Sequence, residues 1–256
     1  METNQRKSRI FLAGDSTVQA YSASQAPQNG WGQRWYECFR GHETCRSCHP
    51  DDSRFPQAVC YELADVILDN RAMAGRSSRS FREEGRLADI EEAMGEGDWL
   101  LVQFGHNDAN TKPERFVPSE EFGASLAHYA DVCRRKKAVC ALVTPIAMRN
   151  SAADGSCSFP EYREAMIEYA KKAGLPLLDL GLATARYCLK EGPEACKRLF
   201  LWVEPGAWPE SAYRDGAQDD AHLQKEGARV FARLLSGLIR ESTDERLAGI
   251  RRLLVE

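Results

Sequence analysis

Residues 10–17 read IFLAGDST, a short apolar run that ends in a glycine and is followed at once by polar residues. The run Ile10–Ala13 shows no alternation of apolar and polar residues, so it predicts a strand buried on both faces. Gly14 predicts a tight turn at the end of this strand, which would leave Ser16 exposed and placed for attack on a substrate. The same residues also fit a plain turn in which Ser16 caps a helix.

Four further apolar runs follow, and amphipathic stretches separate them. The runs are Val66–Leu68, Trp99–Phe104, Val139–Val143 and Leu175–Leu180. Apolar residues recur at helical spacing over residues 122–133, 162–170 and 230–238. Ser119 is the expected N-cap of the first of these helices, and Gly174 is the expected end of the second. Because strands that alternate with helices form βαβ units, the pattern predicts a three-layer α/β/α sandwich.

The composition limits the classes of protein to which the chain can belong. It has 256 residues, of which 43% are hydrophobic and 28% charged, and a net charge of −4. This balance excludes a disordered chain, and no apolar run approaches the roughly 18 residues of a membrane span. The acidic balance also argues against nucleic acid as a partner. We expect a single globular domain over residues 1–256, with no nucleic-acid or membrane partner and an oligomeric state left open.

The N-terminal segment and the cysteines predict the compartment. The apolar stretch after the basic start of the chain, Ile10–Ala13, is too short for the core of a secretory signal, and no cleavage site follows it. The nine cysteines stand at positions 38, 45, 48, 60, 133, 140, 157, 188 and 196. An odd number of cysteines in a chain large enough to fold without them predicts reduced thiols. We therefore expect a cytoplasmic protein, unless an export signal has been removed.

Two segments lack a regular pattern. These are Arg40–Pro56, within a probable loop insertion over residues 40–66, and Gly192–Gly216. The motif Cys45-Arg46-Ser47-Cys48-His49 fits the attachment site of a c-type haem, and with Cys38 and Cys60 it could instead hold zinc. The missing export signal counts against haem, and the unpaired spacing of the flanking cysteines counts against zinc. Unmodified loop cysteines are the favoured interpretation, with no metal and no other cofactor.

Loops that follow the strands are where chemistry is expected, because ligands of open α/β sheets bind at the carboxyl ends of the strands. The loop after the second strand contains Gly75, whose backbone N–H would be accessible to a developing negative charge. The loop after the third strand offers the side-chain amide of Asn107. Each of these loops is an ordinary polar loop when taken alone.

Asp219 and His222 precede the last amphipathic helix. Their spacing of three residues lets one turn of chain bring the Asp219 carboxylate to Nδ1 of His222, which would leave Nε2 free as a base. Asp220 is a competing partner, but adjacent side chains on a turn point apart. A single pair of this kind is weak evidence, since a helix cap beside a surface histidine gives the same pattern.

In combination these residues resemble the SGNH (GDS-type) esterase superfamily, in the same chain order and over nearly the whole chain. Three stretches resemble more narrowly the rhamnogalacturonan acetylesterases of carbohydrate esterase family 12. They are NRAMAGRSS at 70–78, VQFGHND at 102–108 and DDAHLQKEGA at 219–228. Shorter matches are GWGQ at 30–33, EEGRL at 83–87 and LFL at 199–201. The segment 40–66 is longer than in the compact fungal members, and no role is assigned to it.

The resemblance implies a role for each of these residues. Ser16 would be the nucleophile, His222 the base and Asp219 the residue that orients the base. The backbone N–H groups of Ser16 and Gly75 and the side-chain amide of Asn107 would form an oxyanion hole. The resemblance also implies a flavodoxin-like sheet of five parallel strands and no cofactor.

The expected function is an esterase that removes O-acetyl groups from pectic, rhamnogalacturonan-type oligosaccharides through an acyl-enzyme. Trp31, Trp202 and Trp208 would offer flat surfaces to sugars, and Arg76 would pair with a galacturonate carboxylate. One alternative is a lysophospholipase or thioesterase on the same fold, which would need an apolar acyl channel. The others are a non-catalytic sugar-binding module and a redox or metal protein built around Cys45–Cys48.

Overall fold

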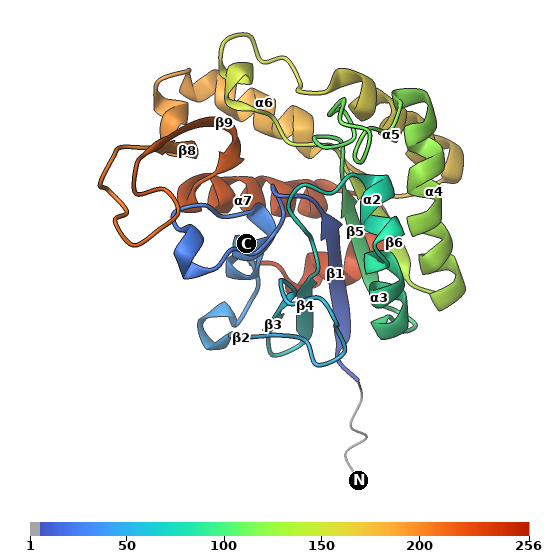
Figure 1. Ribbon diagram of the computed structural model, residues 1–256. Helices are drawn as coiled ribbons and strands as arrows, with labels where there is room; N and C mark the ends of the chain where they lie inside the picture. Colours follow the sequence, from blue (N-terminus) through green and yellow to red (C-terminus); the bar gives the residue numbers. More distant parts are fainter. Residues whose placement is uncertain (1–5, 256) are drawn as a thin grey trace.

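A computed structural model describes residues 6–255, and its centre is a sheet with helices on both faces (Figure 1). The sheet has the strand order β2-β3-β4-β1-β5-β6-β7. Its parallel strands are β1 (Ser8–Gly14), β4 (Val66–Asn70), β5 (Trp99–Gln103), β6 (Val139–Val143) and β7 (Leu177–Leu178). These are the five strands predicted from the apolar runs, and their order is the flavodoxin-like one. Residues 1–5 lie outside the described part, whereas the basic residues Arg6, Lys7 and Arg9 lie within it.

Successive residues of β1 face opposite sides of the sheet, as the pleat requires. Ile10 and Leu12 pack in one core, and Phe11 and Ala13 pack in the other. The first core is closed by α1 (Trp31–Arg34), α6 (Leu180–Glu191), α7 (Lys225–Glu241) and α8 (Ala248–Leu253). The second core is closed by α2 (Ser78–Glu83), α3 (Arg86–Ala93), α4 (Ser119–Lys136) and α5 (Pro160–Ala173). The three predicted layers are therefore confirmed.

Element boundaries differ slightly from those predicted. Helix α4 begins at Ser119, so its N-cap is Pro118 and not Ser119. Helix α5 ends at Gly174 as predicted, and the positive φ of 63° at this residue explains why a glycine stands there. The fifth strand is shorter than expected because the Asp179 carboxylate accepts a hydrogen bond from the backbone of Leu182 and starts α6.

The segment 40–66 was predicted to be a loop, and this is wrong in part. Strands β2 (Arg46–Cys48) and β3 (Val59–Glu62) extend the sheet beyond β4 in antiparallel order. All three residues of β2 are exposed, so no apolar run marks this edge strand in the sequence. Part of this segment is therefore regular structure at the edge of the sheet.

A disulfide joins Cys48 and Cys60, which lie opposite each other in the register with Cα atoms 5.4 Å apart. The prediction of reduced thiols is wrong for this pair, whereas the other seven cysteines are free. Within residues 6–255, the cluster of metal-type donors at this edge combines Glu62 with the same two cysteines. Because the bonded sulfurs are not free ligands, the structure gives no support to the haem or zinc alternative here.

The segment 192–216, predicted to be irregular, contains β8 (Phe200–Val203), which pairs with β9 (Ala217–Leu223) in a separate two-stranded sheet. The register shifts along this pair, with Leu201 opposite Asp219 but Phe200 opposite Leu223. Residues 220–222 therefore bulge from the strand, and bulges of this kind re-aim side chains near functional sites. Asp219 and His222 thus lie on a bulged strand and not on the predicted turn. Among the described residues, no helix is both long and apolar enough to cross a membrane.

Candidate active site

Ser16 lies in the turn that follows β1, at the carboxyl edge of the sheet, and is 8% exposed. A Cβ on Gly14 would lie 2.9 Å from the carbonyl oxygen of Gln103, so only glycine lets β1 and β5 approach this closely. Asp15 holds the turn, because its Oδ1 accepts the backbone N–H and the hydroxyl of Thr17 at 2.9 and 2.8 Å. The turn is therefore rigid before any substrate arrives.

The bulge in β9 brings His222 to this turn. Nε2 of His222 lies 3.0 Å from Oγ of Ser16, and Nδ1 lies 2.7 Å from Oδ2 of Asp219. The other carboxylate oxygen of Asp219 accepts the backbone N–H groups of Ala221 and His222 at 2.7 and 2.9 Å. In this arrangement the carboxylate fixes the tautomer of the imidazole, so that Nε2 can take a proton from the hydroxyl.

The charges at the site suit this proton transfer. Burial acts to raise the pKa of Asp219, but hydrogen bonds from His222 and from the bulge backbone lower it to about 2. Burial acts to lower the pKa of His222, but the hydrogen bond and the negative charge of Asp219 outweigh this effect, and the pKa is raised above its usual value. Asp219 is thus ionised and His222 is a stronger base than a free histidine.

The three residues that carry the expected oxyanion donors line one hollow, whose volume is about 520 Å³. These donors belong to the backbone of Ser16, the backbone of Gly75, where φ is 78°, and the side-chain amide of Asn107. Within residues 6–255 neither backbone N–H donates a hydrogen bond to another protein group. Such free donors beside a nucleophile can stabilise an oxyanion.

Arg115 lies against two of these donors. Its Nη1 donates to Oδ1 of Asn107 at 3.2 Å, which leaves the Nδ2 group of the amide as the free end. A Cβ on Gly75 would lie 3.4 Å from the same guanidinium. Among the described residues Arg115 forms no ion pair. Its position therefore suits it to orient the Asn107 amide.

Asp108 ties together the two loops that carry these donors. Oδ2 accepts the backbone N–H of Gly105 at 3.0 Å, and Oδ1 accepts the backbone N–H and the hydroxyl of Ser78 at 2.9 and 2.5 Å. Burial raises the pKa of Asp108 to about 6 despite these hydrogen bonds. The carboxylate thereby fixes the loop after β4 against the loop after β5.

Comparison with known proteins agrees with this geometry. The model of the GDSL-like Lipase/Acylhydrolase family matches residues 12–230. The chain belongs to this family. It is a carboxylic ester hydrolase.

Two relatives from Bacillus subtilis (strain 168) match over most of their length. "Rhamnogalacturonan acetylesterase RhgT" is 36% identical over 91% of this chain and 90% of its own. "Probable rhamnogalacturonan acetylesterase YesY" is 36% identical over 91% and 92%. The crystal structure of YxiM from Bacillus subtilis has a TM-score of 0.70 at 24% identity, over 92% of this chain and 56% of that one. That structural likeness bears on the fold alone.

The structure corrects two of the predicted sugar-binding residues of this GDSL-like hydrolase. Trp31 is 1% exposed and donates its Nε1–H to Oε1 of Gln103 at 2.7 Å, so it is a core residue. Arg76 does not line the hollow, because its guanidinium is paired with Glu84 at 2.9 Å. Trp202 and Trp208 line a neighbouring hollow and not the one that contains Ser16.

Several residues that line the hollow escaped the sequence analysis. Besides Arg115 they are Tyr21, Met148, Phe159 and Tyr213, along with Gln25, Gln28 and Asn110. These residues lie in loops that carry no recognisable pattern, so their spacing gives no signal. The signal available for them in the sequence is their place in loops at the ends of strands, where functional residues are common.

We expect Asn107→Ala to lower kcat on an aryl acetate by about 10²–10³, because one oxyanion donor is lost. Arg115→Met should lower kcat by roughly five- to ten-fold, since a mobile amide spends less time in the productive orientation. In the double variant the loss should equal that of Asn107→Ala alone, as expected for two residues that act through one group. Steady-state kinetics of the four proteins measures this coupling.

Arg135→Met is the matched control for this cycle, because Arg135 is an arginine that pairs with Glu91 at 2.8 Å and does not line the hollow of Ser16. Its kcat should stay within two-fold of the wild type. Additive losses in the double variant would mean that Arg115 does not act through Asn107.

The activity should fall as pH drops through the pKa of His222, because only the neutral imidazole accepts the Ser16 proton. This acid limb should lie above pH 6.5, the usual histidine value, since Asp219 raises the pKa. Asp219→Asn should move the limb to lower pH and lower the plateau by about 10⁴. The measurement is kcat/KM against pH.

Asp220→Asn provides the matched control, because Asp220 pairs with Arg149 and Trp202 and not with His222. It should leave the position of the acid limb unchanged. An acid limb that stays in place in Asp219→Asn would show that Asp219 does not set the basicity of His222.

Proposed function

We propose that this protein removes O-acetyl groups from pectic, rhamnogalacturonan-type oligosaccharides. The observation that carries the proposal is the hydrogen-bonded chain Ser16–His222–Asp219 in a chain 36% identical over 91% of its length to a rhamnogalacturonan acetylesterase. The hydrogen-bonded chain supports ester hydrolysis as the reaction, and the identity to that relative supports the substrate class. The substrate partner is thus an acetylated oligosaccharide, with no nucleic acid or membrane involved.

In the proposed reaction Oγ of Ser16 attacks the acetyl carbonyl while Nε2 of His222 takes its proton. The resulting oxyanion accepts hydrogen bonds from the N–H groups of Ser16 and Gly75 and from the amide of Asn107. His222 then protonates the departing sugar oxygen, which leaves an acetyl group on Ser16. Water activated by His222 attacks this acyl-enzyme, and acetate leaves with the serine restored.

The lining of the hollow favours a small acyl group on a polar leaving group. Beside Ser16 the walls carry the amide and guanidinium side chains of Gln25, Gln28, Asn110 and Arg115, together with the phenols of Tyr21 and Tyr213. The wholly apolar large side chains of this lining are Met148 and Phe159, a small surface that suits an acetyl methyl group. A lysophospholipase or thioesterase would require an apolar channel for its acyl chain, since an alkyl chain gains most of its binding free energy from burial. We therefore rank the lipid and thioester alternative second and the non-catalytic module third.

The first test compares p-nitrophenyl acetate with the butyrate and octanoate esters, and acetate release from acetylated rhamnogalacturonan oligosaccharides, with Ser16→Ala alongside. We expect hydrolysis that declines with acyl length, acetate release from the oligosaccharide, and loss of both activities in the variant. A preference for octanoate would favour the lipid or thioester alternative. Activity that survives in Ser16→Ala would remove Ser16 from the mechanism.

We also propose a cytoplasmic location, supported by seven free cysteines, five of them buried. The Cys48–Cys60 disulfide argues against a cytoplasmic location, because such bonds persist mainly in oxidising compartments. The proposal therefore implies that this pair, of which Cys48 is exposed and Cys60 is buried, is reduced in the cell. Acid-quenched cells treated with an alkylating reagent should show both thiols labelled by mass spectrometry. A pair protected from labelling until reductant is added would argue for an oxidising compartment.

A further inference from the structure

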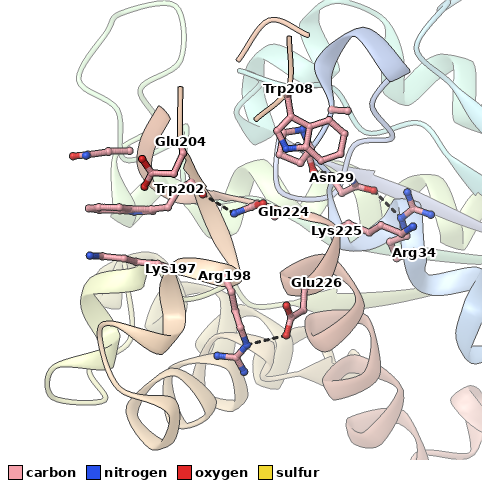
Figure 2. A pocket seen from close by; sticks show the side chains of 13 residues that line it. Asn29, Arg34, Lys197, Arg198, Trp202, Glu204, Trp208, Gln224, Lys225 and Glu226 are labelled. Atoms are coloured by element: carbon pink, nitrogen blue, oxygen red, sulfur yellow. Dashed lines mark hydrogen bonds and ion pairs between the residues drawn. The ribbon is translucent and has the colours of Figure 1, made fainter. Parts of the chain in front are cut away.

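A second hollow of about 780 Å³ lies beside the active site and takes no part in the mechanism above (Figure 2). The two hollows share walls. Gln28 and Asp219 line the hollow of Ser16, whereas their chain neighbours Asn29 and Gln218 line the second one. The segments that contain residues 25–29 and 218–219 therefore form a wall between the two hollows.

The charge of the second hollow differs in sign from that of the whole chain, whose net charge is −4. Its charged lining consists of four basic residues and two acidic ones, Arg34, Lys197, Arg198, Lys225, Glu204 and Glu226. Three of the basic side chains are paired with carboxylates: Arg198 with Glu191 and Glu226 at 2.6 and 2.8 Å, Lys197 with Glu194 at 2.8 Å, and Arg34 with Glu37 at 3.5 Å. Lys225 is exposed and forms no ion pair with the residues described. Lys225 is therefore the basic side chain of this hollow that is left to pair with an anionic ligand.

Two indole rings face this charged space. Figure 2 shows Trp208 on the same side as Lys225 and Arg34, with Trp202 on the opposite side. Trp208 is 42% exposed, one of few large apolar side chains so exposed among the described residues. Trp202 is fixed, because its Nε1–H donates to Asp220 at 2.8 Å and the Lys197 ammonium lies 4.6 Å from its ring centroid.

We propose that the second hollow binds the carboxylate-bearing part of an oligosaccharide chain whose acetylated sugar lies at Ser16. A uronate carboxylate would pair with Lys225, while the flat, partly apolar face of a sugar ring would stack on Trp208. A neutral glycan would gain the stacking but not the ion pairs. This inference rests on the proposed function for its reaction, and it adds the place where the rest of the substrate binds.

The binding test uses trigalacturonate and neutral xylotriose as probes, titrated by calorimetry into Ser16→Ala so that turnover cannot interfere. We expect trigalacturonate to bind more tightly than xylotriose, and its affinity to fall with added salt. Lys225→Glu should weaken trigalacturonate about five- to ten-fold, because an attraction becomes a repulsion. It should change xylotriose by less than two-fold, whereas Trp208→Ala should weaken both sugars.

Lys171→Glu is the matched control, because Lys171 is an exposed lysine on α5 that does not line the hollow. Equal losses in Lys171→Glu and Lys225→Glu would reduce the effect to net charge and overturn the proposal. So would equal affinity for the two trisaccharides.

A second readout separates this inference from the proposed function. The ratio of kcat/KM on acetylated rhamnogalacturonan oligosaccharides to that on p-nitrophenyl acetate should fall in Lys225→Glu, chiefly through KM. If the wild type releases acetate but the ratio does not change, the binding site is wrong and the function stands. If trigalacturonate binds as expected but no acetate is released, the function is wrong and the site stands.

Discussion

The hydrogen bond between Ser16 and His222 joins residues 206 positions apart, and both partners must be held before it can form. On the serine side a buried chain of hydrogen bonds supports the turn. Trp31 donates to Gln103 at 2.7 Å, Gln103 donates to Thr17 at 2.6 Å, and Thr17 donates to Asp15 at 2.8 Å. Because a buried polar group left unpaired costs free energy, each link fixes the next. Trp31 thus stabilises the turn that contains Ser16 through this chain of hydrogen bonds, although it is too buried to contact a sugar.

The proposed oxyanion donors are also held in place by hydrogen bonds. Gly75 and Asn107 lie on different loops, outside any strand or helix whose backbone hydrogen bonds would fix them. Asp108 fastens the two loops through Ser78, and Arg115 orients the amide of Asn107. A preorganised site of this kind needs little rearrangement as negative charge develops on the substrate.

The central sheet could be predicted because its strands are continuous apolar runs, which only a sheet covered on both faces accommodates. The antiparallel strands β2 and β3 at one end of the sheet could not, since this end of the sheet tolerates polar residues such as Arg46 and Glu62. The disulfide depends on the pairing of these two strands, which the spacing of the cysteines does not reveal. A pairing register is set by contacts between distant residues, and local composition carries little of that information.

The residues of the proposed mechanism could be named from the sequence because their types and their places after strands are restricted by the chemistry. The surrounding residues could not. Trp31 and Arg76 have side chains suited to sugars, but burial and the ion pair with Glu84 decide their roles, and both depend on the folded chain. Arg115 had no motif to mark it, although it lies 3.2 Å from Asn107.

The bulge in β9 connects the two hollows through adjacent carboxylates that point in different directions. Asp219 turns toward His222 and the hollow of Ser16, whereas Asp220 binds Trp202 and Arg149. In a regular strand, neighbouring side chains already point to opposite faces of the sheet. The bulge adds three residues that have no partner in β8, and these residues change the direction of the His222 side chain. A deletion within residues 220–222 would therefore disturb both the base and the indole wall. The position of His222 and the contacts of Trp202 thus depend on one irregularity in one strand.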